Sequence, residues 1–282
     1  MEKPSSSRGY FLLCALLMVV VALCRVPGAR SQEVEDEKDF SYVPGSANGP
    51  ERWGDLHEEW GMCKNGTMQS PIDLTDKRVG VVPGLGRLKR SYKPAKAKLK
   101  NRGHDIKLEW LGDAGSIHID GTEYHLKQCH WHSPSEHSIN GIRFAMEVHL
   151  VHQSSDNKIA VLGIMYKRGR PETFLSPLMD PLKSIAGSTD LEREVGVVDP
   201  TNIKLGSRKY YRYLGSLTTP PCDQGVVWSI TRKVRTVSME QVSLLREAVK
   251  DHAEKNARPL QPNNQRAVEF YRPQPDEERP RR

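Results

Sequence analysis

Apolar and polar residues alternate in short runs through the middle of this chain. The runs span residues 106–111, 116–120, 123–132, 144–152 and 159–166. Alternation with a period of two is typical of β-strands that bury one face. Gly112, Gly121, Gly141 and Asn157 lie between the runs at positions suited to turns, so the pattern predicts antiparallel strands joined mostly by hairpins. The run IAVLGIMY is apolar almost throughout, which favours a central strand covered on both faces.

Helical periodicity is confined to two places. Residues 238–253 begin with a serine suited to capping, and Val242, Leu245 and Val249 recur near the helical period, which predicts a helix. Residues 176–187 are expected to form one or two helical turns. The basic run KRSYKPAKAKLKNR (89–102) has alternating lysines, and we interpret it as a solvated sheet edge rather than a polyanion site.

The two ends of the chain differ from this alternating body. Basic residues precede an apolar run at 11–24, and small residues follow at Ala29 and Ser31, so residues 1–31 are interpreted as a secretory signal peptide. The apolar run is shorter than the roughly 20 residues that a membrane-spanning helix needs. Residues 32–39 are expected to be a flexible acidic arm and residues 273–282 a charged, Pro-rich tail. No repeat or linker interrupts the region between them, so residues 32–272 are predicted to be a single domain.

The net charge of the chain limits the kinds of partner that it is expected to bind. The formal charge of the 282 residues is +7, and removal of the leader, with four basic residues and one acid, leaves +4. The remaining basic residues are scattered apart from the 89–102 run, so the composition argues against a nucleic-acid partner. No second hydrophobic segment follows the leader, so we expect no membrane attachment of the mature form. About 250 residues remain, enough for one large β domain.

Cysteine usage is consistent with secretion. Removal of the leader leaves Cys63, Cys129 and Cys222, which allow one disulfide in three pairings. Cys129 lies inside the predicted strand 123–132, so we interpret it as a buried free thiol and expect a Cys63–Cys222 disulfide. Closing that loop of about 160 residues is worth at most about 4–5 kcal/mol of stability. Asn65 starts an Asn-Gly-Thr sequon and is therefore a candidate glycosylation site.

Five of the ten histidines fall in one short stretch of the chain. His130 and His132 are two residues apart and share a strand face, and His149 lies on the next predicted strand. A histidine pair on a strand is more often a surface or core feature than a metal site, but a third histidine on a neighbouring strand favours a metal. Gln128 and Glu147 each lie two residues before a histidine, where they can accept its second ring N–H. Three neutral imidazoles with an open fourth position are typical of a catalytic zinc site.

Several motifs together identify a family resemblance. They are NGPERWG (48–54), QSPID (69–73), NRGHDIKLEW (101–110), QCHWHSPSEH (128–137), FAMEVHLVH (144–152), AVLGIMY (160–166), YLGSLTTPPC (213–222) and VVWSI (226–230). On these motifs the chain resembles the α-class carbonic anhydrases, most closely their plant secretory members, from about Phe40 to Tyr271. The resemblance implies a mainly β fold with a large twisted, mostly antiparallel central sheet and a few short peripheral helices. It also places a metal at the base of a cone-shaped cleft.

The resemblance implies a cofactor and a reaction. Zn²⁺ would be held by His130, His132 and His149. Carbon dioxide would be hydrated reversibly to bicarbonate and a proton, with zinc hydroxide as the nucleophile. The residues that orient the three ligands, in order, would be Gln128, the backbone carbonyl of Asn256, and Glu147.

The remaining site residues also follow from the resemblance. Thr218 would accept a hydrogen bond from the hydroxide and donate one to Glu136, and Thr219 would line the bicarbonate side. His104 would be the proton shuttle, because a half-exposed histidine with a pKa of about 6.5 suits that transfer. Tyr42 would order the water chain. The apolar wall for carbon dioxide would consist of Val151, Val161, Leu217, Val226 and Trp228.

Two other functions are alternatives to carbon dioxide hydration. Some plant relatives with this fold are storage or binding proteins with little activity, and zinc hydroxide could also act as an esterase. The presence of all three histidines together with Glu136 and Thr218 favours the anhydrase. The leader implies the secretory pathway, ending outside the cell in the apoplast or in the chloroplast by the secretory route. We expect a monomer or a homodimer.

Overall fold

The computed structural model describes residues 39–249 and 255–274, and all of them belong to one compact unit. The predicted leader (1–31), residues 32–38 of the acidic arm and residues 275–282 of the tail lie outside the described residues. Among the residues that the structure describes, no helix has both the length and the apolarity needed to cross a bilayer.

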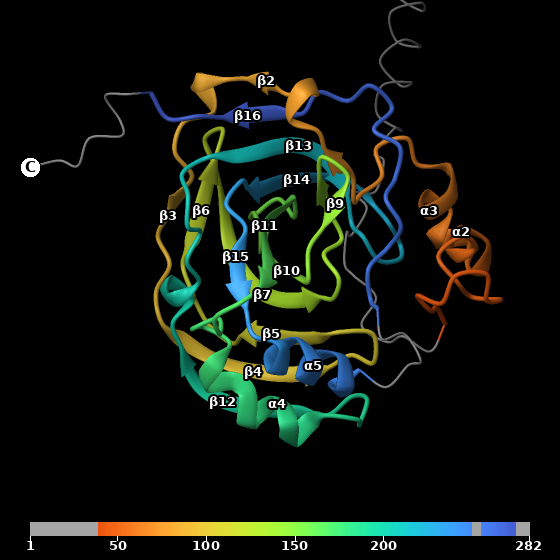
Figure 1. The fold of residues 1–282 in the computed structure, drawn as a ribbon, viewed down its shortest axis with the longest axis vertical. Helices are drawn as coiled ribbons and strands as arrows, with labels where there is room; N and C mark the ends of the chain where they lie inside the picture. The colour runs from red at the N-terminus through yellow and green to blue at the C-terminus, as the bar shows by residue number, and fades with distance from the viewer. Residues whose placement is uncertain (1–38, 250–254, 275–282) are drawn as a thin grey trace, which may run out of the picture. The chain divides into compact units, whose positions relative to one another are not determined.

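A large mixed sheet forms the body of the described domain (Figure 1). Its main path runs in the order β12 (Glu192–Val198), β4 (Ala95–Asn101), β5 (Ile106–Trp110), β7 (Thr122–His132), β10 (Met146–Gln153), β11 (Ile159–Arg168), β14 (Gln224–Thr231), β13 (Tyr210–Ser216), β16 (Glu269–Tyr271) and β2 (Gly80–Val81). Off this path, β15 (Arg235–Val237) pairs with β11, while β3 (Lys89–Arg90) pairs with β6 (Ser116–Ile119), which pairs with β7. A small second sheet contains β1 (Asp73–Leu74), β8 (Ser138–Ile139) and β9 (Ile142–Arg143).

Most neighbouring strands are antiparallel, as the sequence predicts. In the large sheet β11 pairs in parallel with β14 and β15, and β16 pairs in parallel with β2. Residues 159–166 of β11 are all buried between β10 and β14, which confirms that this apolar run is a central strand. The prediction of a mainly β, mostly antiparallel fold is confirmed.

The prediction that the basic run 89–102 is a sheet edge is wrong. Within this run, β4 pairs on one side with β12 and on the other with β5, so it is an interior strand. The lysines at 96, 98 and 100 alternate with buried residues, as expected for one exposed face. Alternation specifies which face a side chain occupies, but it carries no information about which strands lie to either side.

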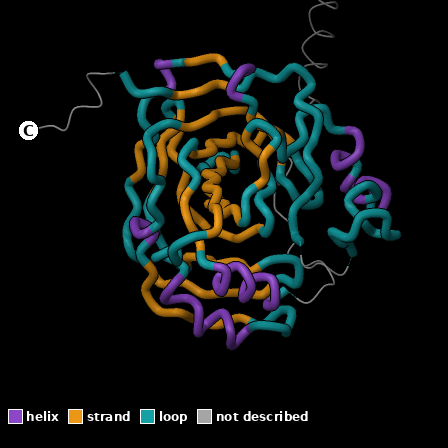
Figure 2. The backbone as a smooth tube through the Cα atoms, in the orientation of Figure 1, coloured by secondary structure: helices purple, strands orange, loops and turns teal. Residues whose placement is uncertain are grey.

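The helices within the described residues are short and lie at the margins of the strand-rich interior (Figure 2). They are α2 (Trp53–Leu56), η1 (Glu58–Trp60), α3 (Met62–Asn65), η2 (Asp76–Arg78), η3 (Pro83–Leu85), η4 (Ser176–Leu178), α4 (Met179–Ile185), η5 (Pro200–Asn202) and α5 (Met239–Ala248). Ser238 caps α5 in a reciprocal pair with Gln241. The helix ends at Ala248, earlier than the sequence predicts, because Val249 already has extended backbone angles.

The strand alternation separates two cores on opposite faces of the sheet. Trp131, Val148 and Leu150 belong to the larger apolar cluster, which also includes residues of α4 and α5. His130, His132 and His149 alternate with them and therefore face the other side, where a second cluster contains Trp228. This division leaves the histidine-bearing face next to an apolar layer.

Candidate metal and catalytic site

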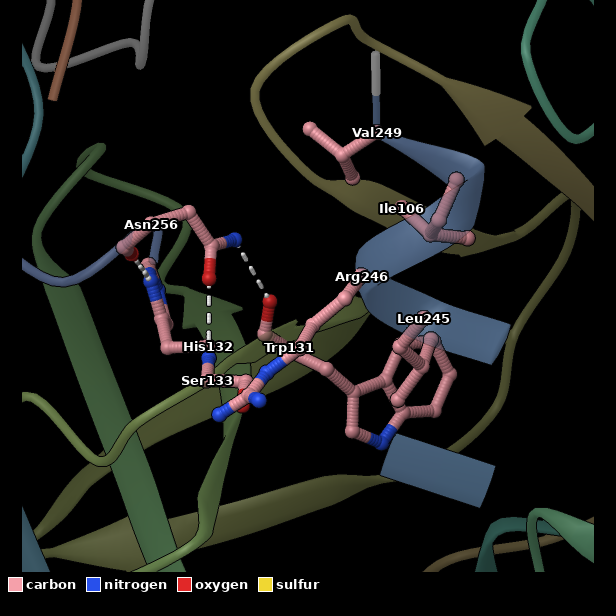
Figure 3. A pocket seen from close by; sticks show the side chains of 8 residues that line it. All are labelled: Ile106, Trp131, His132, Ser133, Leu245, Arg246, Val249 and Asn256. Atoms are coloured by element: carbon pink, nitrogen blue, oxygen red, sulfur yellow. Dashed lines mark hydrogen bonds between the residues drawn. The ribbon is translucent and has the colours of Figure 1, made fainter. Parts of the chain in front are cut away.

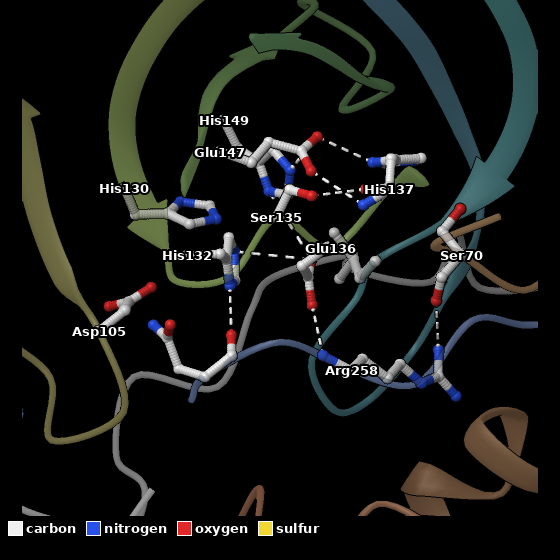
Figure 4. Close-up of polar contacts among 12 residues, drawn as sticks. Ser70, Asp105, His130, His132, Ser135, Glu136, His137, Glu147, His149 and Arg258 are labelled. Carbon is white, nitrogen blue, oxygen red and sulfur yellow. Dashed lines mark hydrogen bonds and ion pairs between the residues drawn. The ribbon is translucent and has the colours of Figure 1, made fainter. Parts of the chain in front are cut away.

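Three imidazoles meet where β7 and β10 pair. The antiparallel register sets His149 opposite His130 and Glu147 opposite His132. One nitrogen from each of His130, His132 and His149 lies within 4.8 Å of the others, and all three side chains are buried (Figure 4). The structure therefore brings together the three histidines that the sequence singles out.

The rings of His130 and His132 are held by hydrogen bonds from their second nitrogens, and the second nitrogen of His149 faces a carboxylate. Nδ1 of His130 donates to Oε1 of Gln128 at 2.9 Å, and Nδ1 of His132 donates to the carbonyl oxygen of Asn256 at 2.6 Å. Nε2 of His149 lies 3.0 Å from Oε1 of Glu147. Because these acceptors hold one ring nitrogen of each histidine, the nitrogens left for a metal are Nε2 of the first two and Nδ1 of the third.

The donor set fits a zinc ion. Burial lowers the pKa of His130 and of His149, so these rings are held neutral, as metal binding requires. Among the described residues, nothing forms a hydrogen bond with the buried Nε2 of His132. Such an unsatisfied buried nitrogen is costly unless a ligand occupies it. Three converging neutral imidazole nitrogens are a common set for tetrahedral zinc with an open fourth position.

Glu147 anchors more than one histidine. Its Oε2 accepts from the backbone N–H of His137 at 2.9 Å, and its Oε1 lies 2.8 Å from Nδ1 of the same ring. Burial by itself raises the pKa of Glu147, but His137 and His149 hold that pKa well below its usual range. Gly163 makes room for the carboxylate, since a Cβ there would lie 2.9 Å from Oε1. Glu147 is therefore a buried carboxylate that stays ionised and aligns His149.

Glu136 lies directly beside the histidines. Its Oε1 accepts from the backbone N–H of Arg258 at 2.9 Å, and its Oε2 lies 3.6 Å from Nε2 of His132. Among the described residues Oε2 has no hydrogen-bond partner, so it is available as an acceptor. Thr218 is buried, but none of the hydrogen bonds of the described chain joins it to Glu136. The Thr218–Glu136 hydrogen bond therefore stays a prediction.

The residues expected to form an apolar wall do pack together on this face. Each of them is buried within the second hydrophobic cluster, which comprises among others Val151, Val161, Leu217, Val226 and Trp228. The ring of Trp228 lies 4.8 Å from that of His149, centroid to centroid. Thr219 is also buried, and its hydroxyl has no partner among the described residues. An apolar surface thus adjoins the imidazole cluster.

The expectation that His104 is half-exposed is wrong. Its side chain is buried, and its ring lies 5.1 Å from that of Phe40. Phe40 belongs to an aromatic cluster with Tyr42, Trp53 and Trp60, so Tyr42 is also buried. The burial depends on residues more than 60 positions away in the sequence, which the local polarity of RGHD does not reveal.

Arg258 is a site residue that the sequence analysis missed. Its guanidinium donates to Oε1 of Gln69 at 2.8 Å and to the carbonyl of Cys63 at 3.1 Å, while its backbone N–H holds Glu136. The pKa of this arginine falls to about 10 because of its burial. Cys63 forms the expected disulfide with Cys222, and Cys129 is a buried free thiol. Arg258 thus connects the Cys63–Cys222 disulfide with Glu136, which lies beside the histidine cluster.

These observations define a mainly β protein in which three buried histidines that could hold a metal ion lie next to an apolar layer. The family model for eukaryotic-type carbonic anhydrases matches residues 48–272, and the chain belongs to the α-carbonic anhydrase family. Membership makes it an enzyme of the carbonic anhydrase type and supports carbon dioxide hydration as its general reaction.

The chain is similar both to proteins named carbonic anhydrases and to proteins named dioscorins. Alpha carbonic anhydrase 7 of Arabidopsis thaliana is 54% identical over 264 residues, covering 94% of this chain and 96% of the relative. Dioscorin dioA3 of Dioscorea japonica is 50% identical, covering 84% and 87%. A solved structure of dioscorin complexed with ascorbate has a TM-score of 0.80 at 49% identity, covering 82% of this chain and 97% of the other. The α-carbonic anhydrase of Thermovibrio ammonificans, in complex with the inhibitor sulfanilamide, has a TM-score of 0.74 at 36% identity, covering 82% and 98%.

Proposed function

We propose that this protein is a zinc-dependent carbonic anhydrase that uses His130, His132 and His149 as metal ligands. The observation that carries the proposal is the convergence of three buried imidazoles, each with its second nitrogen within 3.0 Å of an acceptor oxygen. When bound there, zinc would lower the pKa of a coordinated water to about 7 and so supply a nucleophile near neutral pH. Metal analysis of the purified protein together with a carbon dioxide hydration assay tests this function.

Glu136 and Thr218 set the direction of hydrogen bonding in the site. The N–H of Arg258 fixes one carboxylate oxygen of Glu136, which leaves the other as an acceptor for the Thr218 hydroxyl. A threonine that donates its only proton to Glu136 can then only accept from a group at the metal position. The pair therefore selects ligands that carry a proton and orients their lone pairs.

The apolar wall provides a place for the other reactant. Carbon dioxide is uncharged, and a surface such as Val151, Leu217 and Trp228 holds it without competing for the nucleophile. Thr219, whose buried hydroxyl has no partner among the described residues, can donate to a bicarbonate oxygen. These residues bind and orient the substrate and the product.

We propose His104 as the proton relay on the family resemblance alone, because its burial removes the exposure from which the role was first argued, and Tyr42 would order the path of the proton. Replacing His104 with alanine is expected to lower kcat by about a hundredfold, because proton release limits turnover, while kcat/KM changes little. Adding imidazole buffer is expected to restore kcat. Stopped-flow hydration at several buffer concentrations measures both, and the exposed His118 replaced with alanine is the control. Absence of rescue by imidazole would show that another group carries the proton.

The side chain of Asn256 is expected to position His132 and His104 relative to each other. Its amide nitrogen donates to the carbonyl of Trp131 at 3.0 Å, and its amide oxygen accepts from the N–H of Ser133 at 2.8 Å (Figure 3). The same amide nitrogen also donates to the carbonyl of His104 at 2.9 Å. Its own carbonyl holds the ring of His132. One side chain therefore ties the relay residue to the strand end that bears a metal ligand.

Asn256→Ala removes these three side-chain hydrogen bonds but keeps the backbone carbonyl. We expect zinc to dissociate about tenfold faster, in the range seen when groups that orient metal ligands are lost. Release of the metal to a chromogenic chelator measures the rate. The exposed Asn202 replaced with alanine should match the parent protein. Equal rates for all three proteins would mean that the Asn256 side chain has no positioning role.

The similarity to dioscorins makes a storage or binding protein the second candidate. The complete histidine set with Glu136 beside it favours the enzyme.

We further propose entry into the secretory pathway, with the apoplast or the chloroplast as destination. The Cys63–Cys222 disulfide is consistent with that route, and Asn65 is exposed, as a glycan acceptor must be. N-terminal sequencing and glycosidase treatment of the native protein test both statements.

A further inference from the structure

A second cavity, of about 570 Å³, shares none of its lining residues with the histidine centre. One side is formed by residues 87–90, which include β3, and the other by residues 205, 207 and 208 of the loop that leads to β13. Tyr210 of β13 and Thr231 of β14 complete the lining, and these two residues are paired in the sheet. We refer to this cavity as the basic groove.

Hydrogen bonds fix both sides of the basic groove in place. Nη1 of Arg90 donates to the carbonyl of Ile203 at 3.1 Å, which ties β3 to the segment across the groove. The hydroxyl of Tyr210 lies 3.0 Å from the carbonyl oxygen of Gly86 and 3.2 Å from that of Leu85. The groove is therefore a built feature of the fold and not a gap between independent loops.

The charge of the lining is entirely positive. Four cationic side chains line the groove, and no carboxylate does: Arg87, Lys89, Arg90 and Arg208. Arg90 is half-buried, and that burial lowers its pKa. Its guanidinium lies over the ring of Tyr92 at 5.2 Å, and no carboxylate of the described chain pairs with it. A partly buried cation without an acidic partner is energetically costly unless a ligand compensates its charge.

The hydroxyl of Thr231 gives independent evidence that the basic groove binds a ligand. Thr231 is almost fully buried, lines the groove, and its Oγ1 has no hydrogen-bond partner among the described residues. Buried hydroxyls in folded proteins are nearly always satisfied. An uncompensated guanidinium and an unsatisfied hydroxyl in the lining of one cavity both indicate an oxygen-rich anion.

We propose that the basic groove binds a small molecule that carries a phosphate group, with Arg90 and Lys89 contacting the phosphate oxygens. A guanidinium presents paired N–H donors that match phosphate geometry, and several cations match a ligand with more than one negative charge. The volume lies within the range of roughly 300–1,000 Å³ that small-molecule sites occupy. The inference does not depend on the proposed reaction.

The test is isothermal titration of the metal-loaded protein with inorganic phosphate and with glucose 6-phosphate, at ionic strength held constant with chloride. We expect saturable binding at one site, weakened about tenfold or more by Arg90→Gln because a charge-assisted hydrogen bond is lost. Lys89→Gln, which changes an exposed residue of the same groove, should also weaken binding. The matched control Arg193→Gln, on the exposed surface of β12, should change the affinity by less than about twofold.

The two ligands distinguish the source of the phosphate. Tighter binding of glucose 6-phosphate supports a phosphate ester, whereas equal or weaker binding supports free phosphate as the ligand. Absence of saturable binding overturns the proposal. Binding that survives both Arg90→Gln and Lys89→Gln also overturns it, because the anion then occupies another site, such as the histidine centre. A thermal unfolding transition of Arg90→Gln that matches the parent shows that the variant is folded.

Discussion

Replacing His132 with glutamine will abolish zinc binding and carbon dioxide hydration together. Nε2 of His132 is one of three converging ring nitrogens, and it has no hydrogen-bond partner among the described residues. Loss of a group that merely orients a metal ligand weakens metal affinity by about 10–100-fold, so loss of a ligand itself should weaken it by more than about 100-fold. We expect near-zero zinc by mass spectrometry and activity below about 1% of the parent in stopped-flow assays.

His125 provides a matched control on the same strand. It belongs to β7 but is exposed, and it lies outside the group of candidate metal ligands. His125→Gln should therefore retain one zinc per chain and the parent rate. If His132→Gln kept its zinc and hydrated carbon dioxide at the parent rate, the ligand assignment would be wrong. If it kept zinc but lost activity, His132 would act on the substrate rather than on the metal.

The faces of the strands could be predicted from the sequence because alternation is a local property. The pattern around His130 and His132 is enough to orient them away from Cys129 and Trp131, and the structure has this arrangement. The order of the strands across the sheet could not be predicted in this way. The parallel pairing of β11 with β14 joins residues 67 positions apart, such as Ala160 and Val227, and the interior position of β4 depends on β12. Such contacts leave no periodic signal in either segment.

The same distinction applies to the site. Gln128 and Glu147 could be identified because each lies two residues before the histidine that it contacts. Asn256 emerged only from the family resemblance, and Arg258 was missed because it acts through its backbone N–H on a residue 122 positions away. Asn256 and Arg258 are two residues apart, so a segment with extended backbone would turn both toward one centre. That spacing was the available signal.

Removing the disulfide is expected to have the largest effect on stability. The double variant Cys63→Ser/Cys222→Ser should lower the free energy of unfolding by about 2–5 kcal/mol, because the bond joins residues 159 positions apart and restricts the unfolded chain. Urea denaturation followed by fluorescence measures the change. Cys129→Ala is the control, since it removes a buried thiol without breaking a cross-link and should cost only about 1 kcal/mol.

The disulfide should also influence the site, because its neighbours reach Glu136. The guanidinium of Arg258 donates to the carbonyl of Cys63, and the side chain of Gln69 donates to the carbonyl of Cys222 at 3.0 Å. The side chains of Arg258 and Gln69 also form a hydrogen bond with each other. Breaking the disulfide should increase the mobility of Arg258, and with it of the backbone N–H that fixes Glu136. The double variant should therefore lose hydration activity at temperatures where it is still folded, whereas Cys129→Ala should not. Full activity of the folded double variant would show that the backbone of Arg258 holds Glu136 without help from the disulfide.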